Sequence, residues 1–378
     1  MPAHDITTRG PAHRQRQPAL LHAHPRNGSR RHPTAAILTL RESAGLVTFE
    51  QDVARFGIWH EELIVDPTVV LRAAAVRSSG ETAAMHVPRA PTEMVEFFTS
   101  GADGRALAQQ AVEIAVAGEV SGDRLDGVYD FDAVRLLAPV PRPRRIRDYL
   151  TYTDHATGSG LDVPPAFEAM PICYKCNVES VIGPEQPLLW PSYTDQLDFE
   201  LELGFFTSAG GRDLSPAQAT DRIAGVTIFN DVSARDIQMF EMGLSVGPSK
   251  GKDFCTAMGP CVLTLDEVDE WAVEMTATVN GEVWASGTTA RRQFSFAEVL
   301  AWASLDEDVY PGEFFAVGTI GGGCGYELDR WIQAGDVVEL SATGVGTLRN
   351  PVGAKQIPPV GAGLASYRGA PEVHVHHG

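Results

Sequence analysis

The sequence has few cysteines, fewer basic than acidic residues and no long apolar run. Five cysteines, an odd number in 378 residues, argue against a disulfide framework and indicate a reducing compartment. No apolar stretch approaches the roughly 20 residues that a transmembrane helix needs. Lysine and arginine total 30 against 49 acids, and the formal charge of −19 argues against nucleic acid, whose phosphates attract basic surfaces. We therefore expect a cytoplasmic protein with no membrane or nucleic-acid partner.

Long apolar runs with helical spacing are also scarce, whereas glycine (37 residues) and proline (25 residues) are plentiful. This composition favours a mainly β, α+β fold with many turns over a helical bundle. The apolar share of 44% is enough for a sizeable core and for two domains.

Shifts in composition divide the chain into four predicted segments. Residues 1–35 are rich in arginine and histidine and lack the apolar segment of a secretory signal, so we expect a disordered tail, with an organelle transit peptide as the alternative. A proline-rich stretch ends a small β-rich N-terminal domain, residues 36–135. A larger β-rich domain, residues 136–356, precedes a C-terminal tail, residues 357–378.

Alternating apolar and polar residues predict many short strands after residue 135. Asn280-Gly281 lies between two such runs and is the strongest short signal for a tight hairpin. Helical segments are predicted at 91–101, 104–120, 233–242 and 294–304.

Three carboxylates alternate along the stretch LDFELELGFF, residues 197–206. Side chains on a strand alternate between its faces, so Asp198, Glu200 and Glu202 share one face. Either that face is solvated, or a cation lies against it. Hard divalent cations such as Mg²⁺ and Ca²⁺ prefer oxygen ligands of this kind.

Two later stretches add candidate site residues. Asp231 ends an apolar strand, and the spacing of Ser233 and Asp236 predicts a capping box that starts a helix. Lys252 lies in a glycine-rich loop that does not fit a phosphate-binding loop, because the glycine spacing is too short and an acid follows the lysine. Asp231 could equally be a turn residue, and Lys252 an ordinary surface lysine.

In this order and spacing, the stretches RDYLTYTDHA, LDFELELGFF, FNDVSARDIQ and GKDFCTAMGP resemble the fumarylacetoacetate hydrolase family. The resemblance covers residues 136–351. It implies a mixed β-sandwich roll of the family's C-terminal type, following the smaller β-rich N-terminal domain. It also implies a divalent ion (Mg²⁺, Mn²⁺ or Ca²⁺) and a homodimer.

The resemblance also implies roles for individual residues. His155 matches the general base that activates water, and Lys252 and Thr256 match the loop beside the metal. Arg235 and Gln238 match groups that bind substrate and stabilise its developing charge, and Thr319 matches a substrate-binding threonine. The implied metal ligands are Asp148, Glu200, Glu202 and Asp231.

Three positions depart from the family pattern. Two substrate-contacting tyrosines are replaced by Leu150 and Met242, which predicts a more apolar pocket than that of the namesake enzyme. The glutamate that orients the catalytic histidine has no matching motif. Glu327 is the candidate, with a surface glutamate as the alternative.

The resemblance therefore implies a metal-dependent hydrolase that cleaves a carbon–carbon bond in a 2,4-diketo acid, such as an acylpyruvate, from aromatic-compound catabolism. The metal would polarise the carbonyl, and His155 would activate water. The alternative is an isomerase or decarboxylase of 2-oxo or diene dicarboxylic acids on the same metal site. A non-enzymatic metal-bound module is least favoured, because His155 and Lys252 are both present.

Two other motifs suggest different chemistry. GLSVG around Ser245 fits the nucleophile elbow of serine hydrolases, but a predicted helix precedes the serine where a strand is required, so we interpret it as a chance match. Cys173 and Cys176 have the spacing of a zinc half-site. Without a partner pair, and in an apparent strand, they are interpreted as two packed cysteines.

Overall fold

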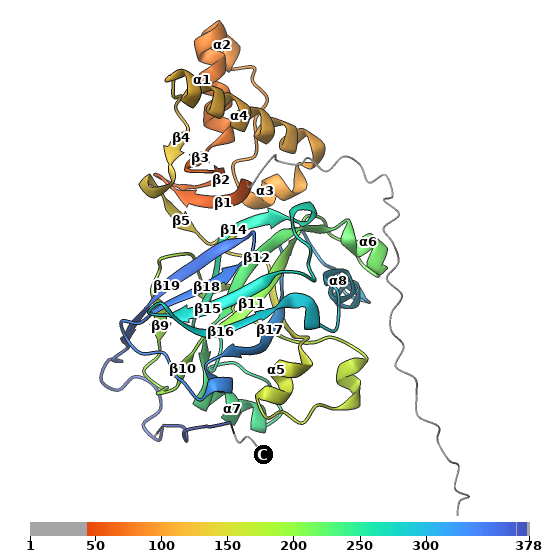
Figure 1. Ribbon diagram of the computed structural model, residues 1–378, viewed down its shortest axis with the longest axis vertical. Helices are drawn as coiled ribbons and strands as arrows, with labels where there is room; N and C mark the ends of the chain where they lie inside the picture. Colours follow the sequence, from red (N-terminus) through yellow and green to blue (C-terminus); the bar gives the residue numbers. More distant parts are fainter. Residues whose placement is uncertain (1–43, 368, 376–378) are drawn as a thin grey trace, which may run out of the picture. The chain divides into compact units, whose positions relative to one another are not determined.

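The computed structural model describes residues 44–367 and 369–375 of the chain. The predicted N-terminal tail, residues 1–35, lies outside the described residues. Within the described part, the chain forms two larger β-sheets, a two-stranded ladder and eight α-helices (Figure 1). This architecture confirms the predicted mainly β, α+β fold class.

The elements up to residue 137 are β1 (Ala44–Glu50), β2 (Ala54–His60), β3 (Leu63–Val65), α1 (Pro67–Ser79), α2 (Glu81–Ala84), α3 (Met94–Thr99), α4 (Gly101–Ser121), β4 (Val128–Asp130) and β5 (Arg135–Leu137). The later elements are β6 (Ile146–Leu150), α5 (Thr153–Gly158), β7 (Ile172–Lys175), β8 (Val181–Ile182), β9 (Leu188–Trp190), β10 (Leu197–Asp198), β11 (Glu200–Thr207), α6 (Pro216–Thr220), β12 (Ile223–Asp231), β13 (Ser233–Ala234), α7 (Arg235–Gly243), β14 (Thr256–Thr264), β15 (Glu274–Val279), β16 (Glu282–Thr288), α8 (Phe296–Ser304), β17 (Phe314–Cys324), β18 (Val337–Ala342) and β19 (Gly346–Lys355).

The larger sheet has 12 strands and carries most of the candidate site. Its order is β4-β3-β2-β1-β14-β12-β11-β17-β6-β7, with β5 paired to β1 and β8 paired to β14. β1 runs antiparallel to β14, with Leu46 opposite Val262, so strands from both predicted domains share this sheet. The division near residue 135 thus falls within a continuous sheet, and as a domain boundary it stays a prediction.

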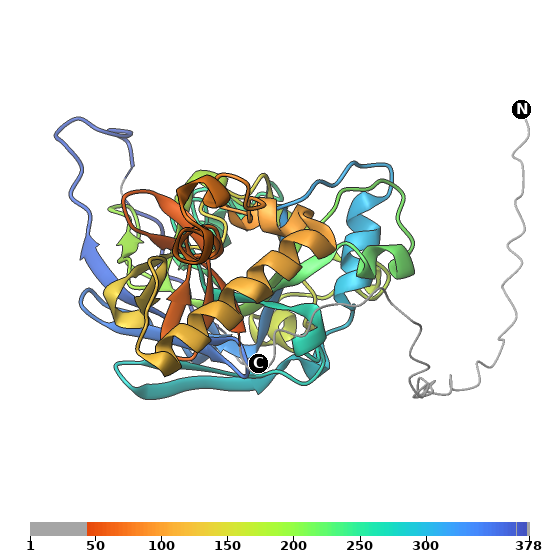
Figure 2. The same cartoon turned by 90° about the horizontal axis from the view of Figure 1, so that it is seen from above.

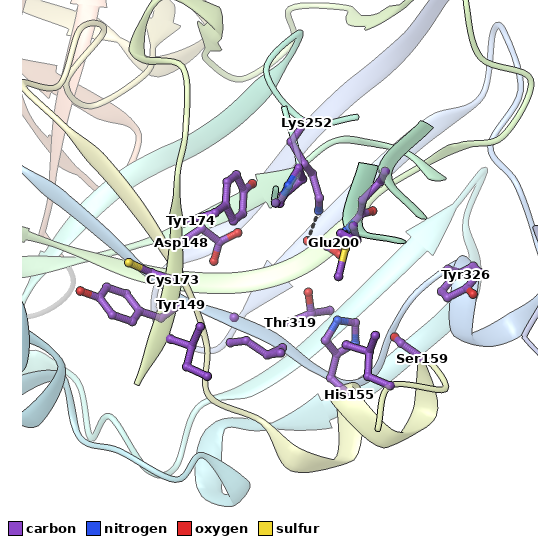
Figure 3. A pocket seen from close by; sticks show the side chains of 18 of the residues that line it. Asp148, Tyr149, His155, Ser159, Cys173, Tyr174, Glu200, Lys252, Thr319 and Tyr326 are labelled. Carbon is purple, nitrogen blue, oxygen red and sulfur yellow. Dashed lines mark hydrogen bonds and ion pairs between the residues drawn. The ribbon is translucent and has the colours of Figure 1, made fainter. Parts of the chain in front are cut away.

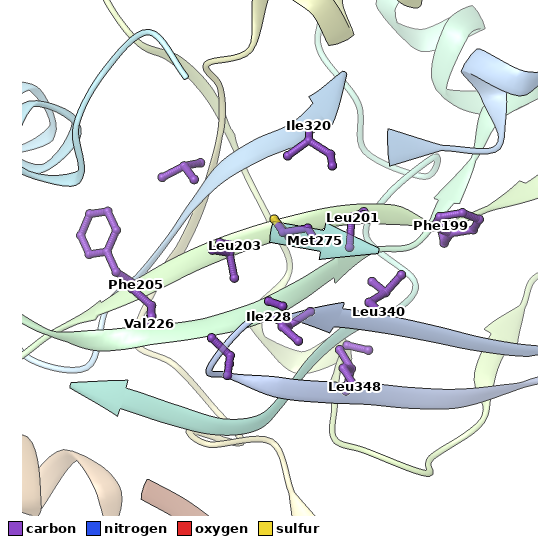
Figure 4. Close-up of a cluster of buried hydrophobic side chains, with 14 of the residues drawn as sticks. Phe199, Leu201, Leu203, Phe205, Val226, Ile228, Met275, Ile320, Leu340 and Leu348 are labelled. Atoms are coloured by element: carbon purple, nitrogen blue, oxygen red, sulfur yellow. The ribbon is translucent and has the colours of Figure 1, made fainter. Parts of the chain in front are cut away.

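The main core lies between the larger sheet and the five-stranded sheet β16-β15-β18-β19-β9. Leu201, Leu203 and Phe205 of β11 point into it, together with Met275 of β15 and Leu340 of β18 (Figure 4). The apolar face of LDFELELGFF is therefore buried in this core, as its alternation predicts. The opposite face carries the carboxylates.

The N-terminal segment combines the predicted strands with four helices, of which α4 is the longest (Figure 2). α3 and α4 match the predicted helical patches, whereas α1 is not predicted by the apolar pattern. Phe56 and Ala111 of this segment share a second core cluster with Phe206 and Phe314 of the larger sheet. The N-terminal helices thus pack against the strands that bear the site.

Two local predictions have opposite outcomes. The hairpin is confirmed: Asn280 and Gly281 join β15 to β16 with φ angles of 52° and 77°, as a tight turn with two left-handed residues requires. The prediction of a capping box at Ser233 and Asp236 is wrong. Ser233 pairs with Asp198 in the β10–β13 ladder, its hydroxyl donates to the carbonyl oxygen of Asp231, and Ala234 occupies the N-cap position of α7.

The described part of the predicted C-terminal tail contains no helix or strand, but it makes specific contacts. The side-chain amide of Gln196 both donates to and accepts from the backbone of Val373, each at 2.7 Å. His374 Nδ1 lies 2.7 Å from Asp329 Oδ1. Among the described helices, none is both long and apolar enough to cross a membrane.

Candidate metal centre and active site

Four buried carboxylates converge on one end of the larger sheet. Asp148 is on β6, Glu200 and Glu202 are on β11, and Asp231 ends β12. β17 lies between β6 and β11, and β12 flanks β11 on its other side, so these strands are successive neighbours. Asp148, Glu200 and Glu202 each offer an oxygen within 4.8 Å of the other two. The solvated-face interpretation of these carboxylates is therefore excluded.

Two buried cations balance part of this negative charge. Lys252 Nζ pairs with Glu200 Oε2 at 2.7 Å (Figure 3). It also lies 2.6 Å from Asp231 Oδ2. Arg235 begins α7 and pairs with Glu200 Oε1 at 2.7 Å through Nη2. Burial opposes ionisation of Glu200, but the two cations outweigh burial, so the pKa of Glu200 lies below its usual range. Lys252 is thus a buried ion-pair partner, and the surface-lysine alternative is excluded.

The negative charges of the other two carboxylates, Asp148 and Glu202, are poorly compensated by nearby cations. Burial raises the pKa of Asp148 well above its usual range, and the charges of Asp231 and Glu200 raise it further. Burial likewise raises the pKa of Glu202, with added repulsion from Asp148 and Glu200. Such a cluster is stable in its ionised form only if another cation lies beside it.

The donor atoms fit a divalent cation. Glu202 Oε2 and Asp231 Oδ1 are buried and have no hydrogen-bond partner among the described residues. Buried polar atoms are nearly always paired, so these orphaned oxygens indicate a missing ligand. All the candidate ligands are carboxylate oxygens, which suit Mg²⁺, Mn²⁺ or Ca²⁺. The carboxylates that could hold such an ion are Asp148, Glu200 and Glu202, with Asp231 beside them.

His155 lies beside the cluster on α5, the helix that follows β6. Its Nδ1 is 2.8 Å from Glu327 Oε2, and both side chains are buried. Glu327 is itself held in place, because Gly322 N–H donates to its Oε1 and the Cys324 thiol donates to its Oε2. A carboxylate at Nδ1 favours the tautomer with its proton on Nδ1, which leaves Nε2 as a proton acceptor. The structure thus brings His155 and Glu327 together, as predicted, and excludes the alternative that Glu327 is a surface glutamate.

Of the other predicted residues, Thr319 and Gln238 line the site but Thr256 does not. Thr319 Oγ1 donates to Glu202 Oε1 at 2.8 Å. Gln238 Oε1 accepts from Arg235 Nη1 at 2.9 Å. Thr256 is buried at the start of β14, opposite Asp231 in the ladder, and is absent from the cavity lining.

Two residues at the site have no predicted role. Asp198 accepts hydrogen bonds from Arg235 Nε at 2.7 Å and from the backbone N–H groups of Gly325 and Tyr326, so it orients the arginine. The Tyr174 hydroxyl donates to Asp231 Oδ2. Asp198 belongs to the alternating carboxylates, so its face was predicted and only its function was missed.

Most of these groups line a cavity of about 270 Å³, from which Asp198, Asp231 and Glu327 are absent. Figure 3 shows Asp148, Glu200 and Lys252 on one side of it and His155 on another. The cavity lining comprises Asp148, Tyr149, Leu150, His155, Ser159, Leu161, Ile172, Cys173, Tyr174, Glu200, Glu202, Arg235, Gln238, Met239, Met242, Gly247, Pro248, Lys252, Gly318, Thr319 and Tyr326.

The structure gives no catalytic role to the GLSVG motif and no metal-binding role to the cysteine pair. Ser245 is exposed in the turn after α7, so a helix precedes it, as expected for a chance match. Cys173 is exposed and lines the cavity, so the prediction that it packs inside the protein is wrong. Neither Cys173 nor Cys176 belongs to a cluster of metal-ligating groups among the described residues.

Comparison with known proteins identifies the family. Residues 144–353, more than half of the chain, match the model of the fumarylacetoacetate (FAA) hydrolase C-terminal domain. The chain belongs to the fumarylacetoacetate hydrolase family. The predicted resemblance over residues 136–351 is thereby confirmed.

Relatives within the fumarylacetoacetate hydrolase family include two oxaloacetate tautomerases. The mitochondrial enzyme of Xenopus laevis is 29% identical over 268 residues, which cover 70% of this chain and 80% of the relative. YisK of Bacillus subtilis is 30% identical over 273 residues, which cover 70% of this chain and 87% of the relative. Both names agree better with the predicted alternative than with hydrolysis.

A solved structure of the family gives a similar result. The 2-hydroxyhepta-2,4-diene-1,7-dioate isomerase of Mycobacterium marinum is 30% identical, with a TM-score of 0.51 over 61% of this chain and 83% of that chain. Tautomerases and isomerases move protons and break no carbon–carbon bond. Membership of this enzyme family is therefore established, whereas the predicted hydrolase reaction is not confirmed.

Proposed function

We propose that this protein is a divalent-metal-dependent enzyme that moves a proton at the carbon beside the ketone of a 2-oxo acid, as a tautomerase or isomerase. The observation that supports this most is the position of His155. It lines the same cavity as the carboxylate cluster, and Glu327 fixes its Nδ1. The tautomerase and isomerase relatives support the same reaction class.

The chain's own groups provide a base and hold it in position. His155 Nε2 would accept a proton from the carbon next to the ketone. The electron pair of that C–H bond would form the carbon–carbon double bond of the enol, while the π pair of the carbonyl moves onto its oxygen. The imidazolium is stabilised by Glu327, and it returns the proton to the substrate oxygen or to a more distant carbon. No water is consumed, and the mass of the substrate is unchanged.

A bound divalent ion would act as a Lewis acid that polarises the substrate carbonyl. Asp148, Glu200, Glu202 and Asp231 would hold that ion. Lys252 and Arg235 fix the orientation of Glu200 by pairing with its two separate oxygens. Thr319 fixes Glu202 in the same way. This preorganisation spares the site from rearranging during the reaction.

The experiment combines ultraviolet absorbance with product mass. The full chain is incubated with oxaloacetate, a hydroxymuconate-type diene acid and 2,4-diketo acids, with Mg²⁺ or with EDTA. We expect a change in enol absorbance at constant mass, lost in EDTA and in His155→Ala. Ser245→Ala, which alters the exposed elbow-like serine, is the control and should retain full activity. Release of two acids would replace this proposal with the hydrolase, and release of CO₂ with a decarboxylase.

Further properties stay proposals with their own tests. We propose a homodimer, which light scattering of the purified chain would measure. The resident ion is proposed to be Mg²⁺, Mn²⁺ or Ca²⁺, and metal analysis of the purified protein would identify it. A cytoplasmic location is proposed from the cysteine content and would be tested by cell fractionation. A role in aromatic-compound catabolism is proposed from the predicted resemblance and would be tested by growth of a deletion strain on aromatic acids.

A further inference from the structure

The cavity has a charged part and an apolar part. Its carboxylates lie on β6 and β11, and its cations are Arg235 at the start of α7 and Lys252 in the loop before β14. Ile172 is 41% exposed, which places this apolar side chain at the boundary between cavity and solvent. The apolar part of the lining consists of Leu150, Leu161, Ile172, Met239, Met242 and Pro248.

Both cations of the cavity are already paired. Lys252 bridges Glu200 and Asp231, and Arg235 bridges Asp198 and Glu200. Asp198, Glu200 and Asp231 therefore already neutralise the charges of Lys252 and Arg235 before a substrate binds. Among the described residues that line the cavity, no other lysine or arginine is present. Lys175 shares β7 with Ile172 but is absent from the lining.

The overall charge of the site disfavours a second anionic group. Asp148 and Glu202, which also line the cavity, have no lysine or arginine as an ion-pair partner among the described residues, so the lining offers no unpaired cation. The chain as a whole carries −19 and repels anions in solution. Ser159 and Tyr326 offer hydroxyl groups to a ligand, but neutral donors do not balance a charge. A distal carboxylate would therefore lose its hydration against apolar side chains without gaining a cation.

We infer that the cavity selects 2-oxo acids with a single carboxylate and an apolar tail over 2-oxo dicarboxylic acids, with Leu150, Ile172 and Met242 determining this specificity. The inference rests on the proposed function, because it assumes that the 2-oxo acid group binds at the carboxylate cluster. An alkyl tail gains free energy by leaving water for the apolar wall. The relatives' oxaloacetate, with its second carboxylate, would then be a poor ligand for this chain.

The test compares two ligands that differ at one terminal carbon. 2-Oxohexanoate ends in a methyl group where 2-oxoadipate ends in a carboxylate. Isothermal titration calorimetry on the full chain with saturating Mg²⁺ measures the Kd of each, independently of turnover. We expect 2-oxohexanoate to bind at least about tenfold more tightly. Equal or tighter binding of 2-oxoadipate would overturn the inference and leave the proposed function intact, whereas failure of both acids to bind would overturn both.

A charge introduced into the wall provides an independent check. Met242→Arg places a cation among the lining residues and should shift the ratio of the two Kd values toward 2-oxoadipate by about tenfold or more. Leu244→Arg is the matched control, because Leu244 is exposed, lies two residues away and does not line the cavity. It should leave the ratio unchanged. An equal shift in both variants would show that only overall charge matters, and it would overturn the assignment of Met242.

Discussion

Replacing Lys252 with methionine should destabilise the metal-free protein strongly. Lys252 is 3% exposed and pairs with Glu200 and Asp231, which are also buried. Methionine fills a similar volume but leaves both carboxylates without this partner. Removing one member of a buried ion pair typically costs about 3–5 kcal/mol in the free energy of unfolding, because the remaining charge stays buried. We expect a loss in this range for Lys252→Met.

Urea denaturation at mildly alkaline pH, where free carboxylates are ionised, measures this loss in EDTA and in Mg²⁺. Mg²⁺ should narrow the gap between variant and wild type, because an ion that binds the folded state supplies the missing positive charge. Lys355→Met is the control: its partner Asp195 is on the surface, so the change should be at most about 1 kcal/mol. A Lys252→Met protein as stable as this control in EDTA would refute the view that the cluster is a charge-balanced ionic site.

Three further predictions concern the base, the metal and the scaffold. Glu327→Gln removes the charge that stabilises the His155 imidazolium, so kcat should fall about 100-fold or more. The Mg²⁺ affinity, measured by calorimetry, should stay unchanged, and a loss of that affinity would contradict this role. The raised pKa values of Asp148 and Glu202 mean that protons must leave before an ion binds, so Mg²⁺ affinity should rise with pH; a flat profile would argue against these ligands. Gly204→Val would put its Cβ 2.2 Å from the Phe314 ring and should cost about 1–3 kcal/mol in urea denaturation, where wild-type stability would contradict the packing.

The carboxylate face could be predicted because strand alternation is a local property. Leu201 and Leu203 face the core, and Glu200 and Glu202 face away from it, as the sequence pattern indicates. The pattern could not show that Asp198 binds Arg235 and backbone N–H groups instead of lining the cavity. That difference depends on the pairing of β10 with β13, which brings together residues far apart in sequence.

The wrong and missed predictions also depend on contacts that local sequence patterns do not reveal. Ser233 has the spacing of a helix cap, but the β10–β13 ladder fixes its backbone as a strand, so the local preference is overridden. Glu327 has no surrounding motif, and only the chain path after β17 brings it within 2.8 Å of His155. Tyr174 reaches Asp231 because β7 pairs with β6 at the edge of the sheet. Contacts between residues far apart in the sequence decided each of these positions.

The most direct test of metal-dependent proton transfer is hydrogen exchange at the carbon beside the ketone. Proton NMR in D₂O would follow the loss of the signal of the hydrogens bound to that carbon in 2-oxohexanoate. The measurement would be made with Mg²⁺ or with EDTA, for wild type and for His155→Ala. The account predicts exchange by wild type in Mg²⁺ well above the enzyme-free rate, and exchange at the enzyme-free rate in EDTA and in the variant. Exchange by wild type that persists in EDTA, or that is undiminished in His155→Ala, would contradict it.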